Sequence, residues 1–330
     1  MRTLKWIAPA ALLACMAVAG APSGAERPYD PPHHTLPPPA LGLSDEDVTV
    51  QANTGIEIER DRTPQAILAE HRRLDRALAA LAPQRKGVVD AYVVAVGLDS
   101  DVVFGREARE AGRVLARRYG AEGRTIVLAG SDGQGPSDLP RGSPGNIAAA
   151  LARIAELMDK KEDVLILYTT SHGAPLGIVY NDGDQGYGAV SPVRLADMLQ
   201  GLGIARRLVM IGACYSGVFV PMLASDDSVV ITAASAERTS FGCQADGDWT
   251  FFGDALINHA LRTRQSLSDA DSEAISLIAT WEDKGGLTPS EPQIEIGVNA
   301  AAWLKVLDQR VPAAETKPVG RPAVSLLEAK

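Results

Sequence analysis

Apolar residues in the middle of the chain fall into short uninterrupted runs that alternate with longer amphipathic stretches. Uninterrupted runs are typical of strands buried on both faces, whereas apolar positions spaced by three or four residues indicate helices. The runs predict strands within residues 88–97, 124–130, 162–173, 206–217, 227–235 and 292–297. The amphipathic stretches predict helices at 63–82, 106–120, 143–161, 191–203, 251–263 and 266–284.

This alternation predicts an α/β fold in which helices cover both faces of a mostly parallel central sheet. One domain over residues 63–310 accommodates all of these elements. In such sheets, ligands and chemistry gather at the carboxyl ends of the strands. The ends of the predicted strands are therefore the place to look for function.

The first residues read as an export signal. Arg2 and Lys5 precede an apolar run over residues 6–20, which is too short for a membrane span, and small residues follow it. Cleavage after Ala19, Ala21 or Ala25 would remove a signal peptide within residues 1–25. We therefore expect an exported protein, periplasmic or secreted.

A second interpretation of this segment stays open. Residues 12–15 resemble a bacterial lipobox, in which Cys15 would be lipidated after cleavage. The protein would then be anchored in the envelope by a lipid, which is the alternative localisation.

Residues 26–62 are dense in proline and predict an extended, mobile tether. His33 and His34 lie there as an adjacent pair without further ligands, so we expect both to be solvated. At the other end, residues 311–330 predict a flexible tail.

Composition narrows the function. The chain has 330 residues and a net charge of −9, which argues against a nucleic-acid partner. Besides Cys15, its cysteines are Cys214 and Cys243. A disulfide between these two is permitted in an exported protein. Against it, a chain of this size needs no such link, and the two cysteines lie in different contexts.

Two predicted strands end in reactive side chains. One ends at His172 and Gly173, and the next along the chain ends at Cys214. Since one helical crossover separates these strands, we expect them to be adjacent and parallel, so that His172 and Cys214 meet at one edge of the sheet.

This pair suits nucleophilic catalysis. A thiol attacks a carbonyl as its thiolate, and a nearby imidazole can take the proton and later protonate the leaving amine. The backbone N–H groups of Gly173 and Cys214 could stabilise an oxyanion, each contributing roughly 2.7–4 kcal/mol. A helix after Cys214 would present its positive end to the thiolate.

Other chemistries fit less well. Ser216 does not lie in a G-x-S-x-G elbow, and no acidic residue is spaced as in a recognisable triad. Residues 181–186, NDGDQG, lack the further carboxylates of a calcium loop and predict a hairpin turn. We expect no metal and no organic cofactor.

A strand ending in Ser-His-Gly, followed by one ending in Ala-Cys-x-Ser-Gly, resembles the caspase-like cysteine peptidases. The legumain branch is the closer match; it includes asparaginyl endopeptidases and the glycosylphosphatidylinositol transamidase subunit, and the chain resembles its exported bacterial members. The similarity extends over roughly residues 64–298 and includes residues 229–256 and 102–112. The chain departs from the family at Gly212, Tyr215 and Phe104.

The resemblance implies a caspase-like three-layer fold and a cysteine endopeptidase with His172 as the catalytic histidine and Cys214 as the nucleophile. Gly173 and Cys214 would form the oxyanion site. The residues that the resemblance places in a substrate pocket are Arg106, Thr239, Ser240 and Asp254.

The expected partner is therefore a peptide or protein, cleaved through a thioester acyl-enzyme, with Asn or Asp before the cleaved bond as the specificity that the family implies. Two alternatives are a transpeptidase using the same pair and a non-catalytic protein that binds peptides or envelope partners. The sequence does not determine the oligomeric state.

Overall fold

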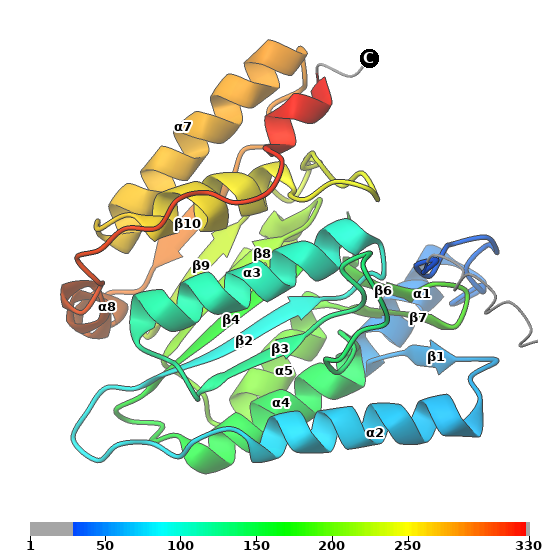
Figure 1. The fold of residues 1–330 in the computed structure, drawn as a ribbon, viewed down its shortest axis with the longest axis horizontal. Helices are drawn as coiled ribbons and strands as arrows, with labels where there is room; N and C mark the ends of the chain where they lie inside the picture. Colours follow the sequence, from blue (N-terminus) through cyan, green and yellow to red (C-terminus); the bar gives the residue numbers. More distant parts are fainter. Residues whose placement is uncertain (1–28, 328–330) are drawn as a thin grey trace, which may run out of the picture.

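A computed structural model of the chain describes residues 29–327 (Figure 1). Its strands are β1 (Glu57–Glu59), β2 (Ala91–Gly97), β3 (Thr125–Leu128), β4 (Val164–Thr170), β5 (Gly173–Ala174), β6 (Gly177–Asp182), β7 (Gly186–Val190), β8 (Arg207–Gly212), β9 (Ser228–Thr232) and β10 (Gln293–Ile296). Its α-helices are α1 (Asp45–Thr54), α2 (Pro64–Ala79), α3 (Val102–Tyr119), α4 (Pro144–Leu157), α5 (Pro192–Gly201), α6 (Val220–Leu223), α7 (Leu267–Gly285) and α8 (Ala300–Gln309).

A six-stranded sheet with the order β10-β9-β8-β4-β2-β3 forms the centre of the molecule. All neighbouring strands are parallel except β10, which runs antiparallel to β9 at one edge. Every residue of β2, β4 and β9 is buried. The predicted mostly parallel sheet, buried on both faces, is therefore confirmed.

Helices cover both faces of this sheet (Figure 1). Val93 and Ala95 of β2 belong to a core that includes residues of α3, α7 and α8, whereas Tyr92 and Val94 belong to a core with residues of α4 and α5. Successive side chains of a strand point to opposite faces, so one apolar strand supplies both cores. The architecture is the predicted α/β fold in three layers.

The helix starts follow from local sequence. Thr63, Ser143 and Ser191 are N-caps whose side-chain oxygens accept hydrogen bonds from backbone N–H groups in the first turns of α2, α4 and α5, and a proline follows each cap. Proline fits the first helical position because its missing N–H would be unsatisfied there anyway. The predicted helix at 251–263 is less regular: it contains a π-helical segment, η2 (Gly253–His259), and a 3₁₀ segment, η3 (Ala260–Arg262).

A smaller antiparallel sheet with the order β1-β7-β6-β5 lies beside the main sheet (Figure 1). β6 and β7 form the hairpin predicted around residues 181–186. β1 pairs with β7, aligning Glu57 with Gly188, and α1 precedes it. The expected tether over residues 26–62 is therefore wrong for residues 45–59, which form secondary structure and pack on the domain.

The last described residues are also held against the domain. The Val319 carbonyl accepts hydrogen bonds from Trp249 Nε1 at 2.8 Å and Asn258 Nδ2 at 3.0 Å, and residues Ala323–Leu327 form a 3₁₀ turn, η4. The expected flexible tail over 311–330 is wrong for these residues.

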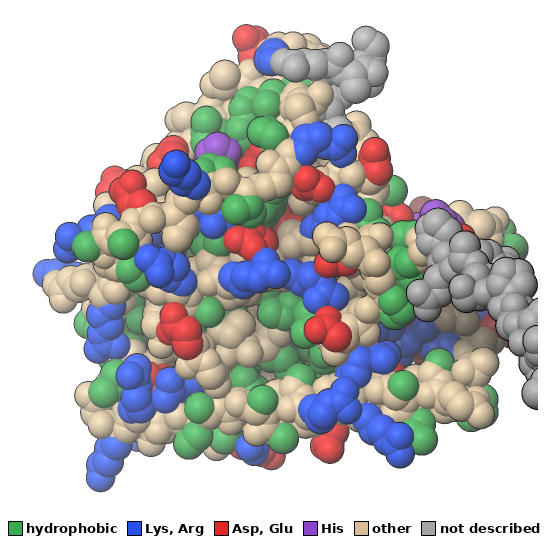
Figure 2. All heavy atoms as spheres, in the orientation of Figure 1, with side chains coloured by type: hydrophobic (Ala, Val, Ile, Leu, Met, Phe, Trp, Pro, Cys, Tyr) green, Lys and Arg blue, Asp and Glu red, His purple; other side chains and the backbone are tan. Residues whose placement is uncertain are grey.

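Acidic and basic side chains are interspersed over the face shown in Figure 2, so this face has no broad basic surface of the kind that binds nucleic acid. Among residues 29–327, no helix is both long and apolar enough to span a bilayer. The predicted signal peptide and Cys15 lie outside the described residues.

Candidate active site

β4 and β8 are neighbouring parallel strands, and their ends define the site. Thr170 is aligned with Gly212, and the Ser171 N–H donates to the Gly212 carbonyl at 3.1 Å. His172 and Cys214 each lie two residues beyond this aligned pair. The prediction that the two strands are adjacent and parallel, with both residues at the same edge, is confirmed.

Gly173 lies directly against the backbone of Cys214. A Cβ atom at position 173 would lie 2.1 Å from the Cys214 carbonyl oxygen and 3.0 Å from the Cys214 nitrogen. Only glycine allows so close an approach. The absence of a side chain here brings the residue after His172 against the residue predicted to be the nucleophile.

The chain turns sharply after Cys214. Tyr215 has a φ of 58°, which is uncommon for a residue other than glycine, and its N–H donates to the Arg238 carbonyl at 2.8 Å. Only a 3₁₀ turn, η1 (Ser216–Phe219), and the four-residue helix α6 follow. The expected contribution of a helix dipole to the thiolate is therefore limited to a very short element.

The Cys214 thiol is held by the loop that follows β9. The Ser240 N–H donates to Sγ at 3.3 Å, the Ser240 hydroxyl lies 3.7 Å from Sγ, and the thiol can donate to the Ser240 carbonyl at 3.6 Å. The first two contacts favour the anionic form of the sulfur, because a donated hydrogen bond stabilises a thiolate.

The Cys243 thiol is a second partner of Cys214. Both cysteines are free, so the disulfide considered from the sequence is not formed. A hydrogen bond from Cys243, then those from Ser240 and the charge of His172, lower the pKa of Cys214 to about 6 against the opposing effect of burial. The same coupling raises the pKa of Cys243, so Cys214 is the thiol that ionises first.

His172 faces a carboxylate and an aromatic ring. Its Nε2 lies 3.7 Å from Asp101 Oδ2, and the Phe104 ring packs edge-on against it with centroids 5.1 Å apart. The interaction with Asp101 raises the pKa of His172, while burial opposes this shift.

A lowered thiol pKa and a raised imidazole pKa favour a thiolate–imidazolium pair. Within the described residues, His172 and Cys214 interact through charge and no direct hydrogen bond joins them. The absence of a hydrogen bond between His172 and Cys214 among these residues is compatible with catalysis, because such contacts often tighten only when a substrate is bound.

The residues predicted to line a substrate pocket are not brought together. Ser240 touches Cys214, as described, and the neighbouring Thr239 is exposed. Arg106 instead donates to the carbonyls of Asp132 and Gly247 and to Asp248 Oδ1 at 2.9 Å. It lines a cleft of about 300 Å³ to which neither His172 nor Cys214 contributes.

Asp254 is fully buried and serves the fold. Its carboxylate accepts hydrogen bonds from the Ala323 N–H at 2.7 Å and from Asn258 Nδ2 at 2.8 Å. Arg106 and Asp254 therefore do not face each other in this structure, where the C-terminal segment donates to the Asp254 carboxylate.

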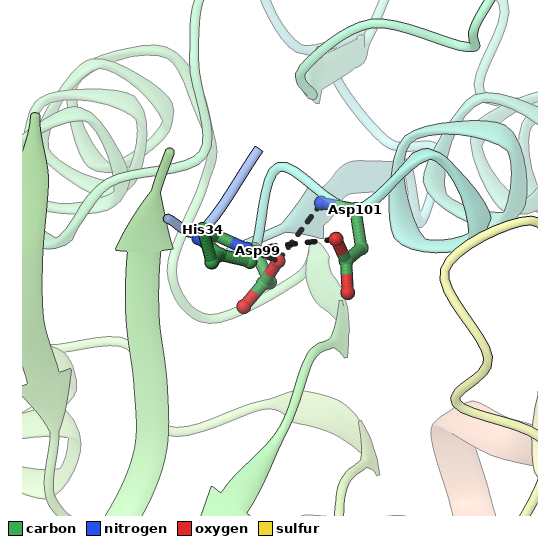
Figure 3. A group of neighbouring side chains, drawn as sticks. All are labelled: His34, Asp99 and Asp101. Atoms are coloured by element: carbon green, nitrogen blue, oxygen red, sulfur yellow. Dashed lines mark hydrogen bonds and ion pairs between the residues drawn. The ribbon is translucent and has the colours of Figure 1, made fainter. Parts of the chain in front are cut away.

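An acidic pair near His172, Asp99 and Asp101, and the contact of His34 with this pair were not predicted from the sequence. His34 lies close to Asp99 and Asp101 (Figure 3), although we expected it to be solvated. Asp99 and Asp101 directly follow a buried strand, which is a signal that could have found them. Among residues 29–327, His34, Asp99 and Asp101 are the group whose ligand atoms lie close enough together to hold a metal, all within 4.8 Å of one another.

The comparison with protein families agrees with this chemistry. Residues 144–282 match the model of the peptidase C13 family, a segment that contains both His172 and Cys214. This match identifies the chain as a cysteine-type peptidase, a hydrolase, and favours an enzyme over the alternative of a non-catalytic binding protein. Its substrate is accordingly a peptide or protein.

Among solved structures, the crystal structure of caspase-1 from Spodoptera frugiperda is similar, with 16% sequence identity and a TM-score of 0.42. The similarity covers 66% of this chain and 93% of that chain. No curated protein sequence matches the chain.

Proposed function

We propose that the chain is an endopeptidase in which Cys214 is the nucleophile and His172 is the general acid and base. The observation that carries this proposal is the placement of both residues two positions beyond the aligned pair Thr170 and Gly212. The lowered pKa of Cys214 and the raised pKa of His172 support it, because they provide the thiolate and the proton donor near neutral pH.

The reaction would proceed in two steps. The Cys214 thiolate attacks the carbonyl carbon of the scissile bond, and the new oxyanion accepts hydrogen bonds from the N–H groups of Gly173 and Cys214. The His172 imidazolium gives its proton to the leaving amine as the C–N bond breaks, which leaves a thioester. Water then attacks the thioester, His172 takes the proton of that water, and the thiolate leaves. Because Nε2 of His172 faces Asp101, Nδ1 is the nitrogen left for these transfers.

Cleavage after Asn or Asp is the specificity that we infer from the resemblance to the legumain branch. Ser240 supports a substrate-binding role for its loop because it touches Cys214. The positions of Arg106 and Asp254 give no support to the particular pocket expected.

Fluorogenic peptides that differ only in the residue before the cleaved bond test this proposal. Peptides with Asn, Asp, Arg, Lys and Ala are compared on the protein and on its Cys214→Ala and His172→Ala variants. Turnover by the unmodified chain that is lost in both variants supports the pair, and the preferred peptide defines the specificity. Turnover that survives in folded Cys214→Ala would refute the assignment of the nucleophile. Adding an amine acceptor and measuring ligated product separates hydrolysis from transpeptidation.

We further infer that the protein works outside the cytoplasm. Arg2 and Lys5 followed by the apolar run of residues 6–20 support this. Sequencing the amino terminus of the protein from an exporting host tests it. A start after Ala19, Ala21 or Ala25 indicates a cleaved signal peptide, and a lipid-modified start at Cys15 indicates the anchored alternative. An intact start at Met1 contradicts cleavage and leaves only an uncleaved anchor, and recovery of that form inside the cells contradicts export.

A further inference from the structure

Residues 30–36, here called the N-terminal strap, are bound at the turn of the β6–β7 hairpin. The N–H groups of Thr35 and Leu36 donate to Asp184 Oδ1 at 2.9 and 2.8 Å, and the Thr35 hydroxyl donates to Asp184 Oδ2. A Cβ at Gly183 would lie 3.2 Å from the Pro32 Cβ. The hairpin turn thus fixes the backbone of the strap on both sides of His34.

His34 is oriented by this turn. Its Nδ1 donates to the Gly183 carbonyl at 3.1 Å, so its Nε2 points away from the turn toward two carboxylates. Nε2 lies 2.9 Å from Asp99 Oδ1 and 3.5 Å from Asp101 Oδ1 (Figure 3). These carboxylates raise the pKa of His34 to about 9, with the hydrogen bond to Asp99 as the largest cause, so the imidazole is a cation near neutral pH.

The two carboxylates need a cation between them. The Asp99 side chain is 1% exposed, and its Oδ2 is buried without a hydrogen-bond partner. Two like charges this close repel, and burial strengthens the repulsion. Nε2 of His34 lies close to both carboxylates, so the single positive charge of an imidazolium there reduces the repulsion between Asp99 and Asp101.

Asp101 connects this cluster to His172. Its Oδ1 faces His34 and its Oδ2 lies 3.7 Å from His172 Nε2, so one carboxylate bridges two imidazoles. Asp101 is the N-cap residue of α3, yet its side chain makes no capping hydrogen bond. Its backbone N–H donates instead to Asp99 Oδ1 at 2.8 Å. The Asp101 carboxylate therefore interacts with the two histidines and does not cap the helix.

We propose that His34 is a positioning residue for catalysis: the N-terminal strap holds Asp101 in place, and Asp101 in turn holds His172. This inference rests on the proposed role of His172. Without His34, Asp101 would keep one imidazole partner, would face the uncompensated charge of Asp99, and would turn toward water. His172 would then lose the contact that fixes its ring.

The same three residues could also gather around a divalent cation, and this is an alternative that the test must separate. The 2.9 Å separation of Nε2 from Asp99 Oδ1 is an ordinary charge-assisted hydrogen bond, which a protonated His34 satisfies without a metal.

The test compares His34→Ala with His33→Ala in the full chain. His33 is the adjacent residue, and its side chain is 62% exposed and hydrogen-bonded to Asp30, so it makes no hydrogen bond to the acidic pair within residues 29–327 and serves as a matched control. Asp184→Ala provides a second route, since it releases the backbone of the strap while leaving His34, Asp99 and Asp101 unchanged. Measured quantities are kcat, KM, the rate of Cys214 alkylation by iodoacetamide at pH 6, and the melting temperature.

We expect His34→Ala to lower kcat roughly 10- to 100-fold with little change in KM, as a displaced catalytic group does. Alkylation of Cys214 should slow as well, because its thiolate loses a well-placed imidazolium. Asp184→Ala should change both rates in the same direction and by less, and His33→Ala should match the unmodified protein. A strap that only stabilises the fold would lower the melting temperature and leave both rates of the folded protein unchanged, which would overturn the inference.

Alkylation separates this inference from the proposed function. If no peptide is cleaved by the unmodified protein, the proposed function fails. Slower alkylation of Cys214 in His34→Ala would still support the positioning role of His34. If peptides are cleaved and His34→Ala equals the unmodified protein in both rates, the inference alone fails. Loss of activity on chelation with restoration by Zn²⁺ or Ca²⁺ would also overturn it, since a metal would then occupy the place assigned to the His34 cation.

Discussion

Gly173 and Cys214 are in backbone contact, so the residue after His172 is packed against the residue that we assign as the nucleophile. The space between them leaves no room for a methyl group. This contact couples the end of β4 to the turn after β8.

We expect Gly173→Ala to separate these two segments. Its Cβ would have to move away from the Cys214 carbonyl oxygen, which is a backbone atom that cannot turn aside, and overpacking of this kind costs roughly 1–3 kcal/mol. Thermal unfolding should show the loss of stability, and peptide turnover should fall further than stability explains. Gly201→Ala in α5 is the control, since nothing lies within 4 Å of its added methyl group. Normal turnover by Gly173→Ala would mean that the site tolerates a shift of Cys214.

Asp101→Asn should shift the alkaline limit of activity to lower pH. Asp101 is the largest cause of the raised pKa of His172, so a neutral amide lets that pKa fall. The imidazolium is then lost at a lower pH, and the alkaline limb of kcat/KM moves down. Asp197→Asn, an exposed change on α5, is the control. An alkaline limb that stays in place would show that another group titrates there.

Cys243→Ala should make Cys214 a weaker acid. The Cys243 hydrogen bond is the largest cause of the Cys214 pKa of about 6, and the thiolate is the form present above that value. Without the donor the pKa rises, so alkylation at pH 6 slows and the acid limb of kcat/KM moves to higher pH. The effect should vanish at high pH, where both proteins carry the thiolate. Cys243→Ser keeps a donor and should behave more like the unmodified chain; equal profiles for all three proteins would contradict the coupling.

Asp254→Ala should lower stability without changing which peptide is preferred. It leaves the Ala323 N–H without its acceptor in a buried place and removes one of the two acceptors of Asn258 Nδ2, and an unsatisfied buried group costs about 1–3 kcal/mol. Denaturant unfolding measures the loss, with Asp246→Ala as an exposed control. A changed ratio of Asn to Ala peptide turnover in folded Asp254→Ala would restore Asp254 to the substrate pocket.

The sequence was sufficient to predict that His172 and Cys214 lie at the same edge of the sheet, for a physical reason. His172 and Cys214 each follow a strand that is apolar on both faces, and the carboxyl ends of neighbouring parallel strands must lie at one edge. Ser240 was placed near the site by resemblance, and the structure puts its N–H against the Cys214 sulfur.

The surroundings of the pair could not be predicted in the same way. His34 lies in a proline-rich stretch without periodicity, and its partners Asp99 and Gly183 are 65 and 149 positions away. The partners of Asp254 could not be predicted, because the position of a carboxylate in a motif does not reveal which segment will cover it. Side-chain contacts across such distances depend on the finished fold rather than on local pattern.

The docking of the N-terminal strap determines when, during synthesis of the chain, the site can be assembled. Residues near the start of a chain leave the ribosome first, yet Nδ1 of His34 lacks the carbonyl that orients the ring until Gly183 has been added. The sulfur of Cys214 likewise lacks its donors until Ser240 and Cys243 have followed. The first described segment to be synthesised is therefore among the last to be seated, and a nascent chain carries no assembled site with which to attack its neighbours.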